Sequence, residues 1–451
     1  MVSERLREYI HSNLGKFSKQ IIDLAHQPSV SARNEGIEKC ASMVEEMMRE
    51  IGIQTKILRL EGASPLVYGE LKSARSSKTV LFYNHYDVQP EEPVEKWVSP
   101  PFKPEVRNGR IYGRGVSDDK GELVSRLKLA ESYLRSEGEP PCTMKFCFEG
   151  EEEIGSPNLD RYVVANADRL RADAVFWEWG GVDEKDRPVV QLGVKGMIYL
   201  ELAVKTLSAD VHSRNAAALP SAPWRLVRFL SLLKGDDERI RVPDWYDDIE
   251  HLDAEELKIL GEEPFNAKEY LANFGAREFA GGMSPAEAKR RLVFGPTANV
   301  SGLWSGYTGS GSKTVLPSEA HCKLDLRLVP EQDPDKLLRS FKKFVIDSGF
   351  ADIEVRALQL EPAARTSHQS PFAQAVVSAG ESAFGKKSVV RLCAPGTGPL
   401  HVFTKRYGIP AVSIGVSAPD SGMHAPNENL RLDVLEKGML WFAESLDRFA
   451  S

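Results

Sequence analysis

Apolar and polar residues follow each other with helical spacing at the start of the chain. Apolar positions in the first 52 residues predict helices over Glu4–Ala25 and Glu35–Glu50, the second of which is closed by Gly52. Two short strands are expected to follow, near Gln54–Leu60 and Leu66–Glu70. The first part of the chain therefore combines both kinds of secondary structure.

The next apolar run, Thr79–Tyr83, is continuous, as in a strand whose sheet is covered on both faces. A loop rich in proline and glycine, Trp97–Arg114, leads to a helix that is expected to end near Ser136. Strands are expected again over Thr143–Phe148 and Ala172–Trp177. Strands that alternate with helices in this way predict an α/β domain.

The pattern changes near Val194–Gly196. A compact α+β unit is expected to follow, with strands and helices over Ile198–Thr206, Pro220–Lys234, Glu319–Val329, Pro334–Ile346 and Ile353–Leu358. The acidic helical stretch Trp245–Arg291 is interpreted as an insertion within this unit. The first pattern then resumes, with elements expected over Pro371–Phe384, Val389–Leu392, Ala411–Val416 and Leu430–Phe449.

The simplest architecture is an α/β domain with a mixed, largely parallel sheet and helices on both faces, interrupted by a smaller α+β domain. We place the two parts of the α/β domain at residues 1–195 and 363–451, and the smaller domain at residues 196–362.

Composition excludes several classes of partner. The 451 residues are 42% hydrophobic and 27% charged, with a net charge of −7, and no basic stripe suggests a nucleic acid or an anionic membrane surface. The chain starts with a charged amphipathic segment that lacks the apolar core of a signal peptide, and no stretch approaches the roughly 20 apolar residues of a membrane span. Its five cysteines show no CxxC spacing, which indicates reduced core residues of a cytoplasmic protein.

Carboxylates and histidines gather where the expected strands end. Four glutamates lie within the five positions 149–153, and they would repel one another unless a cation lay among them. Other strand ends bring His85 with Asp87, Glu178 and, after a loop, His424, while Asp118 precedes a helix. Ligands of open α/β sheets bind beyond the carboxyl ends of the strands.

Two imidazoles and several carboxylates at one edge suit a pair of divalent ions that share one carboxylate. Nitrogen and oxygen ligands without thiolate favour zinc, manganese or cobalt. Asp87 could accept the second N–H of His85. Taken singly, His85 could be a satisfied polar residue, Asp118 a helix N-cap and Glu178 a solvated loop residue. The joint pattern is what indicates a metal site.

A series of short motifs surrounds these residues: His85-Tyr86-Asp87-Val88-Gln89-Pro90, Gly113-Arg114-Gly115, Asp118-Asp119-Lys120-Gly121, Glu152-Glu153-Ile154-Gly155-Ser156, Asp210-Val211-His212-Ser213, Lys313-Thr314-Val315-Leu316-Pro317, Arg327-Leu328-Val329-Pro330 and Met423-His424-Ala425-Pro426-Asn427-Glu428. In these motifs the chain resembles the dinuclear metallopeptidases that include carnosinase, cytosolic nonspecific dipeptidase, aminoacylase and glutamate carboxypeptidase. The resemblance extends over about Asn84–Glu428, with the motifs in family order.

The resemblance implies two divalent ions per subunit, with zinc preferred and manganese or cobalt as alternatives. It implies that His85 and Glu178 bind one ion, that Glu153 and His424 bind the other, and that Asp118 bridges them.

The resemblance further implies that Asp87 orients His85 and that Glu152 is the general base and acid. Gly155-Ser156 fixes this register, and Glu151 is the alternative to the chosen pair of glutamates.

The smaller domain of such relatives is a ferredoxin-like lid through which they dimerise. The resemblance implies that His212 reaches a partner's active site and stabilises an oxyanion there; a local hydrogen bond with Asp210 is the alternative. Arg327 matches an arginine that grips a substrate carboxylate, with a structural salt bridge as its alternative.

Further substrate contacts are expected from Thr314 and from Gly396 and Thr397, which would line one pocket. His368 is interpreted either as a substrate-side histidine or as a loop residue. Carnosinase-like relatives carry Gly-Gly-Ser-Ile-Pro where this chain reads Ala394-Pro395-Gly396-Thr397-Gly398, so their dipeptide preference is not carried over.

Three functions follow from these observations. The first is hydrolysis of a peptide bond next to a free carboxylate, as in a dipeptidase or carboxypeptidase, by a homodimer without nucleic-acid or membrane partners. The second is deacylation of N-acyl amino acids. The third is a catalytically silent binding protein on the same fold, which would have lost Glu152 or a metal ligand; this chain retains them all.

Overall fold

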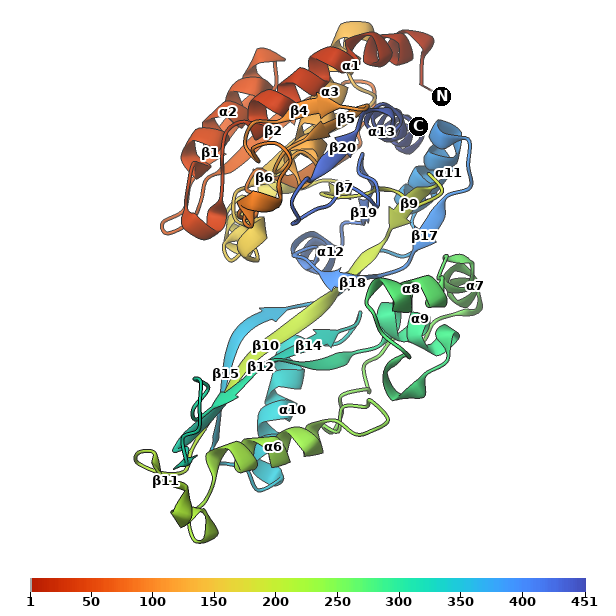
Figure 1. Ribbon diagram of the computed structural model, residues 1–451. Helices are drawn as coiled ribbons and strands as arrows, with labels where there is room; N and C mark the ends of the chain where they lie inside the picture. Colours follow the sequence, from red (N-terminus) through yellow and green to blue (C-terminus); the bar gives the residue numbers. More distant parts are fainter. Residues whose placement is uncertain (1) are drawn as a thin grey trace.

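The computed structural model describes residues 2–451 and shows two bodies joined by a narrow waist (Figure 1). The first body holds both ends of the chain and a nine-stranded sheet in the order β1-β2-β6-β3-β7-β19-β9-β17, with β8 paired to β9. Its strands are β1 (Gln54–Leu58), β2 (Leu66–Leu71), β3 (Thr79–His85), β6 (Thr143–Glu149), β7 (Ala174–Trp177), β8 (Gly181–Val182), β9 (Pro188–Gln191), β17 (Val389–Arg391) and β19 (Ala411–Ser413).

Four neighbouring strands in the middle of this sheet run parallel. β3 pairs in parallel with both β6 and β7, and β7 pairs in parallel with β19. The carboxyl ends of these four strands therefore meet at one edge of the sheet, as the sequence predicted. β1 and β2 add an antiparallel margin, so the sheet is mixed.

Helices cover both faces of this sheet because its central strands are apolar on both sides. Val80 and Phe82 belong to one buried cluster, whereas Leu81 and Tyr83 belong to a second cluster on the other face. The first face is covered by α1 (Glu4–Ala25), α2 (Ile37–Glu50), α3 (Lys120–Ser136), α11 (Pro371–Phe384) and α13 (Leu432–Ala450). The second face is covered by α4 (Leu159–Ala165), α5 (Ala167–Leu170) and α12 (His401–Tyr407). The expected α/β class is confirmed.

The second body is an α+β unit around an antiparallel sheet of order β12-β14-β10-β15. These strands are β12 (Thr297–Ser305), β14 (Glu319–Leu328), β10 (Gly193–Lys205) and β15 (Ile353–Glu361), with a short pair of β11 (Val211–His212) and β13 (Val315–Leu316). Helices α6 (Ala222–Leu233) and α10 (Pro334–Asp347) pack on one face of the sheet. Three helices form the expected insertion: α7 (Ala254–Glu262), α8 (Ala267–Asn273) and α9 (Pro285–Phe294).

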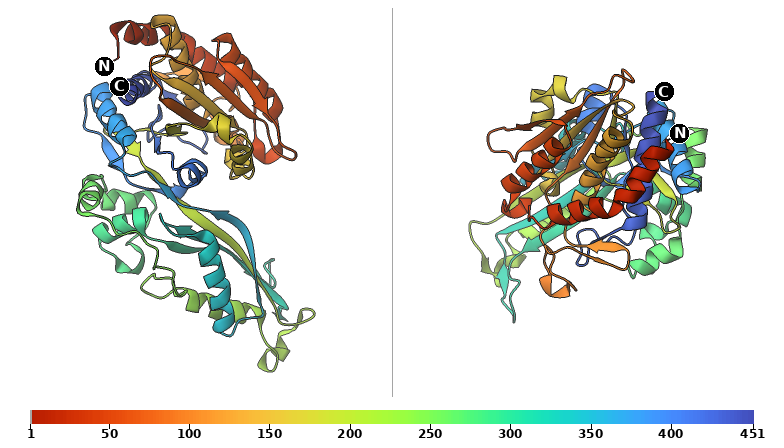
Figure 2. Two further views of the ribbon diagram at one scale, coloured as in Figure 1. Left: turned by 180° about the vertical axis from the view of Figure 1, so that it is seen from behind. Right: turned by 90° about the horizontal axis from the view of Figure 1, so that it is seen from above.

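One strand crosses from the first body to the second. β10 begins at Gly193, where it pairs with β16 (Ala364–Arg365) and β18 (Ala394–Thr397), and from Gly196 onward it pairs with β14. The long strand is visible from both sides of the molecule (Figures 1 and 2). The expected boundary at residues 195/196 therefore falls inside a continuous strand, which leaves little freedom for a flexible linker on this side.

Several short elements differ from expectation. The loop over Trp97–Arg114 contains a hairpin of β4 (Glu105–Arg107) and β5 (Arg110–Tyr112). Asn429–Arg431 forms strand β20 on this hairpin instead of the first turn of the last helix. All five cysteines are buried and unpaired within residues 2–451, as expected. Among the helices of residues 2–451, none combines the length and apolar content that crossing a membrane requires.

Candidate metal centre

Four strand ends and one helix start converge on the carboxyl edge of the large sheet. His85 is the last residue of β3, Glu178 directly follows β7, and Glu152 and Glu153 begin a 3₁₀ turn just after β6. Asp118 lies two residues before α3, and His424 lies in the loop between β19 and β20. Every metal ligand expected from the sequence is thus delivered by a different segment.

Asp118 lies between the two imidazoles. Its Oδ1 is 3.1 Å from Nε2 of His85, and its Oδ2 is 2.9 Å from Nε2 of His424. Oε2 of Glu153 is 3.2 Å from the same nitrogen of His424. Oε2 of Glu152 is 3.9 Å from Nε2 of His85. This arrangement has the form of two ligand sets that share one carboxylate.

The donor atoms fit divalent ions. His85, Asp118 and Glu153 each offer one atom within 4.8 Å of the others, and His85, Glu152 and Glu178 form a second such group. Oε1 of Glu153 and Oε2 of Glu178 are buried and have no hydrogen-bond partner within residues 2–451. Buried carboxylate oxygens without a partner are costly, so they indicate that a cation belongs beside them.

The electrostatics of the cluster point the same way. Burial raises the pKa of Glu152 and of Glu178 well above the usual range, and the neighbouring carboxylates raise it further. The pKa of Asp118 is lowered despite its burial, because both histidines donate hydrogen bonds to it. Hydrogen bonds to Asp118 and Glu153 raise the pKa of His424 to about 10. Divalent cations would replace protons as the counter-charge of this cluster.

Asp87 connects the two sides of the site. Its Oδ1 is 3.4 Å from Nδ1 of His85, and its main-chain oxygen is 3.1 Å from the same nitrogen. The two carboxylate oxygens also accept hydrogen bonds from the main-chain N–H groups of Glu152 and Glu153, at 3.2 and 3.0 Å. One fully buried carboxylate thus orients the imidazole and holds the glutamate turn.

The other glutamates of the cluster have structural partners. Glu151 accepts hydrogen bonds from the Ser64 main chain and the Asn158 side chain, at 2.7 and 2.9 Å. Glu149 accepts hydrogen bonds from Tyr83 and Ser156. No hydrogen bond to the Glu152 carboxylate is found within residues 2–451. The geometry therefore favours the register that places Glu152 and Glu153 at the metal centre.

Glu428 supports the centre without having been assigned a role from the sequence. Its fully buried carboxylate accepts hydrogen bonds from the guanidinium of Arg114 (2.7 Å) and from three main-chain N–H groups, those of Gly115 (3.0 Å), Ser117 (2.9 Å) and Asp118 (3.0 Å). The signal was present, since Arg114 and Glu428 both lie in the motifs that carry the family resemblance, but their pairing is not visible in a linear sequence.

Asp119 and Gln89 form hydrogen bonds with two of the expected metal ligands, His85 and Glu153. Oδ2 of Asp119 accepts hydrogen bonds from the Asn84 side chain (2.7 Å) and the His85 main chain (3.1 Å). The Gln89 amide donates to Oε2 of Glu153 at 2.9 Å. His85 and Glu153 therefore each have a supporting contact besides their neighbours in the cluster.

Three of the expected substrate residues lie beside the centre. Arg327 donates from Nη1 to Oγ1 of Thr397 at 2.5 Å, and its Nε is 3.0 Å from Asp325. Gly396, Thr397 and the metal-centre residue Glu178 line one cavity of about 270 Å³. The alternative for Arg327, a structural salt bridge, is thus present as its contact with Asp325, while the same guanidinium also faces the turn with Thr397.

His212 and Thr314 lie elsewhere in the chain. Both belong to the short β11–β13 region of the second body, where the main-chain N–H of Ser213 donates to the oxygen of Thr314. His212 is exposed and accepts a hydrogen bond from the main chain of Arg214, while Asp210 binds Ser318 instead. Thr314 does not line the cavity with Gly396 and Thr397, so the single chain does not form the shared pocket expected from the sequence.

His368 is also separate from the metal cluster. It is held against α7, with Nε2 3.2 Å from Glu255 and Nδ1 3.9 Å from Glu256. These contacts are with the helical insertion and involve none of the metal-centre residues.

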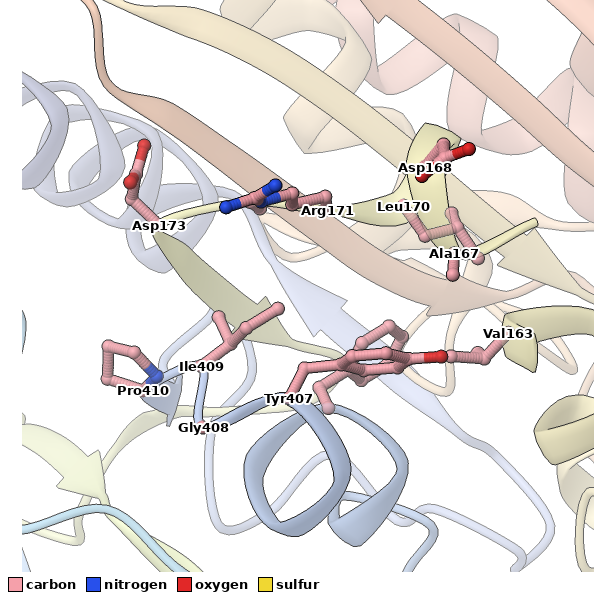
Figure 3. Close-up of a pocket in the computed structure, with 12 residues that line it drawn as sticks. Val163, Ala167, Asp168, Leu170, Arg171, Asp173, Tyr407, Gly408, Ile409 and Pro410 are labelled. Carbon is pink, nitrogen blue, oxygen red and sulfur yellow. The ribbon is translucent and has the colours of Figure 1, made fainter.

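A larger cavity of about 560 Å³ lies at the opposite edge of the sheet (Figure 3). Asp168, Arg171 and Asp173 lie along one wall, and Tyr407 and Ile409 along the other. Asp173 precedes the first residue of β7, whereas Glu178 follows the last, so the strand separates this cavity from the metal centre.

A carboxylate placed between two histidines, with further glutamates at the carboxyl edge of an α/β sheet, suits the pair of divalent ions that many metal-dependent hydrolases use. The chain belongs to peptidase family M20/M25/M40, whose sequence profile matches residues 81–448. It is therefore a hydrolase of the metallopeptidase class.

Individual relatives extend this assignment over the whole chain. The chain is 27% identical to the Cys-Gly metallodipeptidase dug1 of Schizosaccharomyces pombe, with 100% of this chain and 99% of the relative covered. It is similar to the structure of the M20 family metallo-carboxypeptidase Sso-CP2 from Sulfolobus solfataricus, with a TM-score of 0.90, 35% identity and 100% of both chains covered. Human carnosine dipeptidase 1 shares the fold, with a TM-score of 0.79, 23% identity and coverage of 99% of each chain.

Proposed function

We propose that this protein hydrolyses the peptide bond next to the free carboxylate of a dipeptide or short peptide. The observation that carries the proposal is the carboxylate of Asp118 between His85 and His424, with the carboxylate of Glu152 beside it and without a hydrogen bond within residues 2–451. The names of the relatives support the substrate class, because a dipeptidase and a carboxypeptidase both cleave a bond adjacent to a terminal carboxylate.

His85 and Glu178 would hold one divalent ion, Glu153 and His424 the other, and Asp118 both. Two ions held in this way lower the pKa of water and stabilise negative charge that develops on the substrate carbonyl oxygen. We propose zinc, with manganese or cobalt as alternatives, because the donors are nitrogen and oxygen atoms without thiolate.

Glu152 would move the proton. Its carboxylate lies 3.9 Å from His85 and keeps its lone pairs free, so one oxygen can take a proton from the attacking water and give it to the leaving amine nitrogen. Asp87 would hold Glu152 in place through its main chain while it orients His85. The presence of the base and of all the ligands argues against a catalytically silent binding protein.

Arg327 and Thr397 would bind the substrate carboxylate. The guanidinium is held between Asp325 and Thr397, and Thr397 lines the same cavity as Glu178. Gly396 leaves the wall of that cavity open, because a Cβ there would meet no atom within 4 Å. A carboxylate beside the scissile bond is shared by peptides and N-acyl amino acids. We favour peptides over the deacylase alternative because the relatives matched over nearly their full length at 27% and 35% identity are named a dipeptidase and a carboxypeptidase.

We propose that residues 196–362 form a lid through which two copies of the chain associate. β12 is an edge strand of the lid sheet and exposes Val300, Leu303 and Trp304. Helix α6, which packs on the adjacent strand β14, exposes Trp224 and Val227. An exposed edge strand beside an apolar helix face is suited to pairing with a second copy.

Association of this kind would bring lid residues of one chain to the metal centre of the other chain. His212 and Thr314 lie together in the lid and away from the metal cluster, so they would serve the partner's centre, with His212 donating a hydrogen bond to the developing oxyanion. His368 has no part in this proposal, because it is bound to α7. We also propose a cytoplasmic location, because all five cysteines are buried and unpaired.

The test compares two neighbouring glutamates. Glu152→Gln should bind two metal ions per chain but lose about 10³-fold or more in kcat on dipeptides, because the proton carrier is gone. Glu151→Gln is the matched control. It keeps an oxygen that can accept from Ser64 and should retain activity within a few fold of the wild type. Wild-type-like turnover of Glu152→Gln would refute the assignment of the base.

A further inference from the structure

Arg126 holds the ends of three adjacent strands from behind the metal centre. It lies in α3 and is fully buried. Its guanidinium donates to main-chain oxygens of Tyr83 (2.9 Å), Trp177 (3.2 Å) and Ile414 (3.3 Å), and also to that of Glu178. Tyr83 belongs to β3, Trp177 ends β7, and Ile414 follows β19, so a single side chain spans three neighbouring parallel strands.

A charged group is a costly way to hold these strands together. Burying a guanidinium requires a counter-charge and partners for its N–H groups, and apolar side chains often stabilise a core as well or better. The counter-charge is Glu122, one turn earlier in α3 and 3.7 Å away, which itself accepts a hydrogen bond from the main chain of Val416 at 2.8 Å. The pair therefore demands an explanation beyond packing.

Arg126 contacts the main chain near His85 and Glu178, the two residues proposed to bind one of the metal ions. β3 ends in His85, and Glu178 directly follows Trp177, so the guanidinium binds the main chain of Glu178 itself and a main-chain oxygen two residues before His85. The side chain of Glu178 is held separately, by a hydrogen bond from Trp177 Nε1 at 3.2 Å.

The other half of the centre is supported by different groups. Glu153 is held by Asp87 through its main chain and by Gln89 through its side chain, and Asp118 is held by Glu428. Arg126 contacts none of these residues among its hydrogen bonds within residues 2–451.

We propose that Arg126 is a positioning residue that sets the geometry and the charge balance of the metal position formed by His85 and Glu178, without touching the metal ion. The guanidinium fixes the backbone from which both ligands project and places a permanent positive charge behind the carboxylate cluster. The inference rests on the metal centre of the proposed function, but not on the identity of the substrate.

The experiment measures stepwise metal binding by the full-length protein. Chelator-stripped wild type and variants are titrated with Zn²⁺ by calorimetry in the presence of a competing chelator. Glu178→Gln and Glu153→Gln serve as references, because each should weaken one of the two binding steps. Arg126→Met should weaken the same step as Glu178→Gln by about tenfold or more and leave the other step within about threefold, which is the size of effect known for groups that orient metal ligands.

Two further variants separate positioning from general stability. Arg126→Lys keeps the charge, but a single ammonium cannot reach four carbonyl oxygens, so it should restore part of the affinity of that step. Lys128→Met is the matched control: Lys128 is also a buried cation of α3, paired with Glu131 at 2.9 Å. It should lower stability and leave both binding steps unchanged. If Arg126→Met does not fold, Arg126→Lys alone must show the selective loss.

Equal weakening of both steps by the Arg126 variants would overturn the proposal, because it would indicate a general effect on the fold. Unchanged binding in folded variants would overturn it too. A wild type that binds two ions but cleaves no peptide would refute the proposed substrate and leave the role of Arg126 standing. If Glu178→Gln and Glu153→Gln both bind metal as the wild type does, the assignment of the metal ligands itself is refuted.

Discussion

The hydrogen bonds between Glu428 and the loop that carries Asp118 predict a large effect of a Glu428 substitution on stability. The Glu428 carboxylate is fully buried and accepts four hydrogen bonds, one from Arg114 and three from main-chain N–H groups that include that of Asp118. Glu428→Gln removes the charge and turns an amide N–H₂ toward these donors. Breaking a buried pair costs about 3–5 kcal/mol, since the remaining charge is left uncompensated.

We therefore expect Glu428→Gln to lower the free energy of unfolding by about 3–5 kcal/mol, a large part of the 5–15 kcal/mol typical of a folded protein. Urea denaturation followed by tryptophan fluorescence and circular dichroism measures this change. Because the loop carries Asp118, the variant should also bind metal more weakly.

A double variant tests the physical reason. If the carboxylate mattered only as the partner of Arg114, replacing both by apolar residues would restore stability, as it does for many buried pairs. Here three main-chain donors would remain unsatisfied, at about 1–3 kcal/mol each. Arg114→Met/Glu428→Leu should therefore stay well below the wild type. A double variant as stable as the wild type, or a loss below 1 kcal/mol in Glu428→Gln, would refute the reasoning.

Three other predictions concern the crossing strand β10 and the lid. Burial lowers the pKa of Lys195 to about 8, so between pH 8 and about 10.4 the unfolded chain binds more protons than the folded one. The free energy of unfolding of the wild type, relative to that of Lys195→Met, should therefore rise with pH over this range, by at most about 3 kcal/mol. A difference in urea midpoints that does not change with pH would contradict the lowered pKa. Leu303→Glu on the exposed edge strand should convert a dimer to a monomer in analytical ultracentrifugation, whereas Val98→Glu, at an exposed apolar position of the first body, should not. Mixing His212→Ala with Glu152→Gln subunits should restore about a quarter of wild-type activity if the centre is shared between two chains, and verified mixed dimers without activity would exclude that sharing.

The sequence was most informative where the chain is regular. Thr79–Tyr83 and Thr143–Phe148 are apolar runs whose carboxyl ends must meet if the strands are parallel, so the convergence of His85 with the glutamate turn followed from local patterns. The supporting contacts could not be predicted in this way. Glu428 is 310 residues from Asp118 along the chain, and Arg126 reaches Ile414 across 288 residues.

The path of the chain between the two bodies could not be predicted from the sequence either, because it depends on contacts between distant residues. The change of pattern near Val194–Gly196 predicted a domain boundary, yet β10 continues through it, because a strand may exchange its partners without interruption. Thr314 was expected near Gly396 and Thr397, but its main-chain oxygen accepts a hydrogen bond from Ser213, next to the β11–β13 ladder that contains His212. In the proposed association of two chains, the contacts between lid residues and the metal centre would be set by the assembly, which one sequence does not describe.

Hydrolysis of a peptide bond beside a free carboxylate at a two-metal centre is tested most directly with a panel of substrates. Protein stripped with a chelator is refilled separately with zinc, manganese or cobalt and incubated with free dipeptides, short peptides and N-acetyl amino acids. We expect no activity without metal, and cleavage of the free peptides after two equivalents of metal have bound. Cleavage of the N-acetyl amino acids alone, or no cleavage of any substrate with two metals bound, would contradict the proposed function.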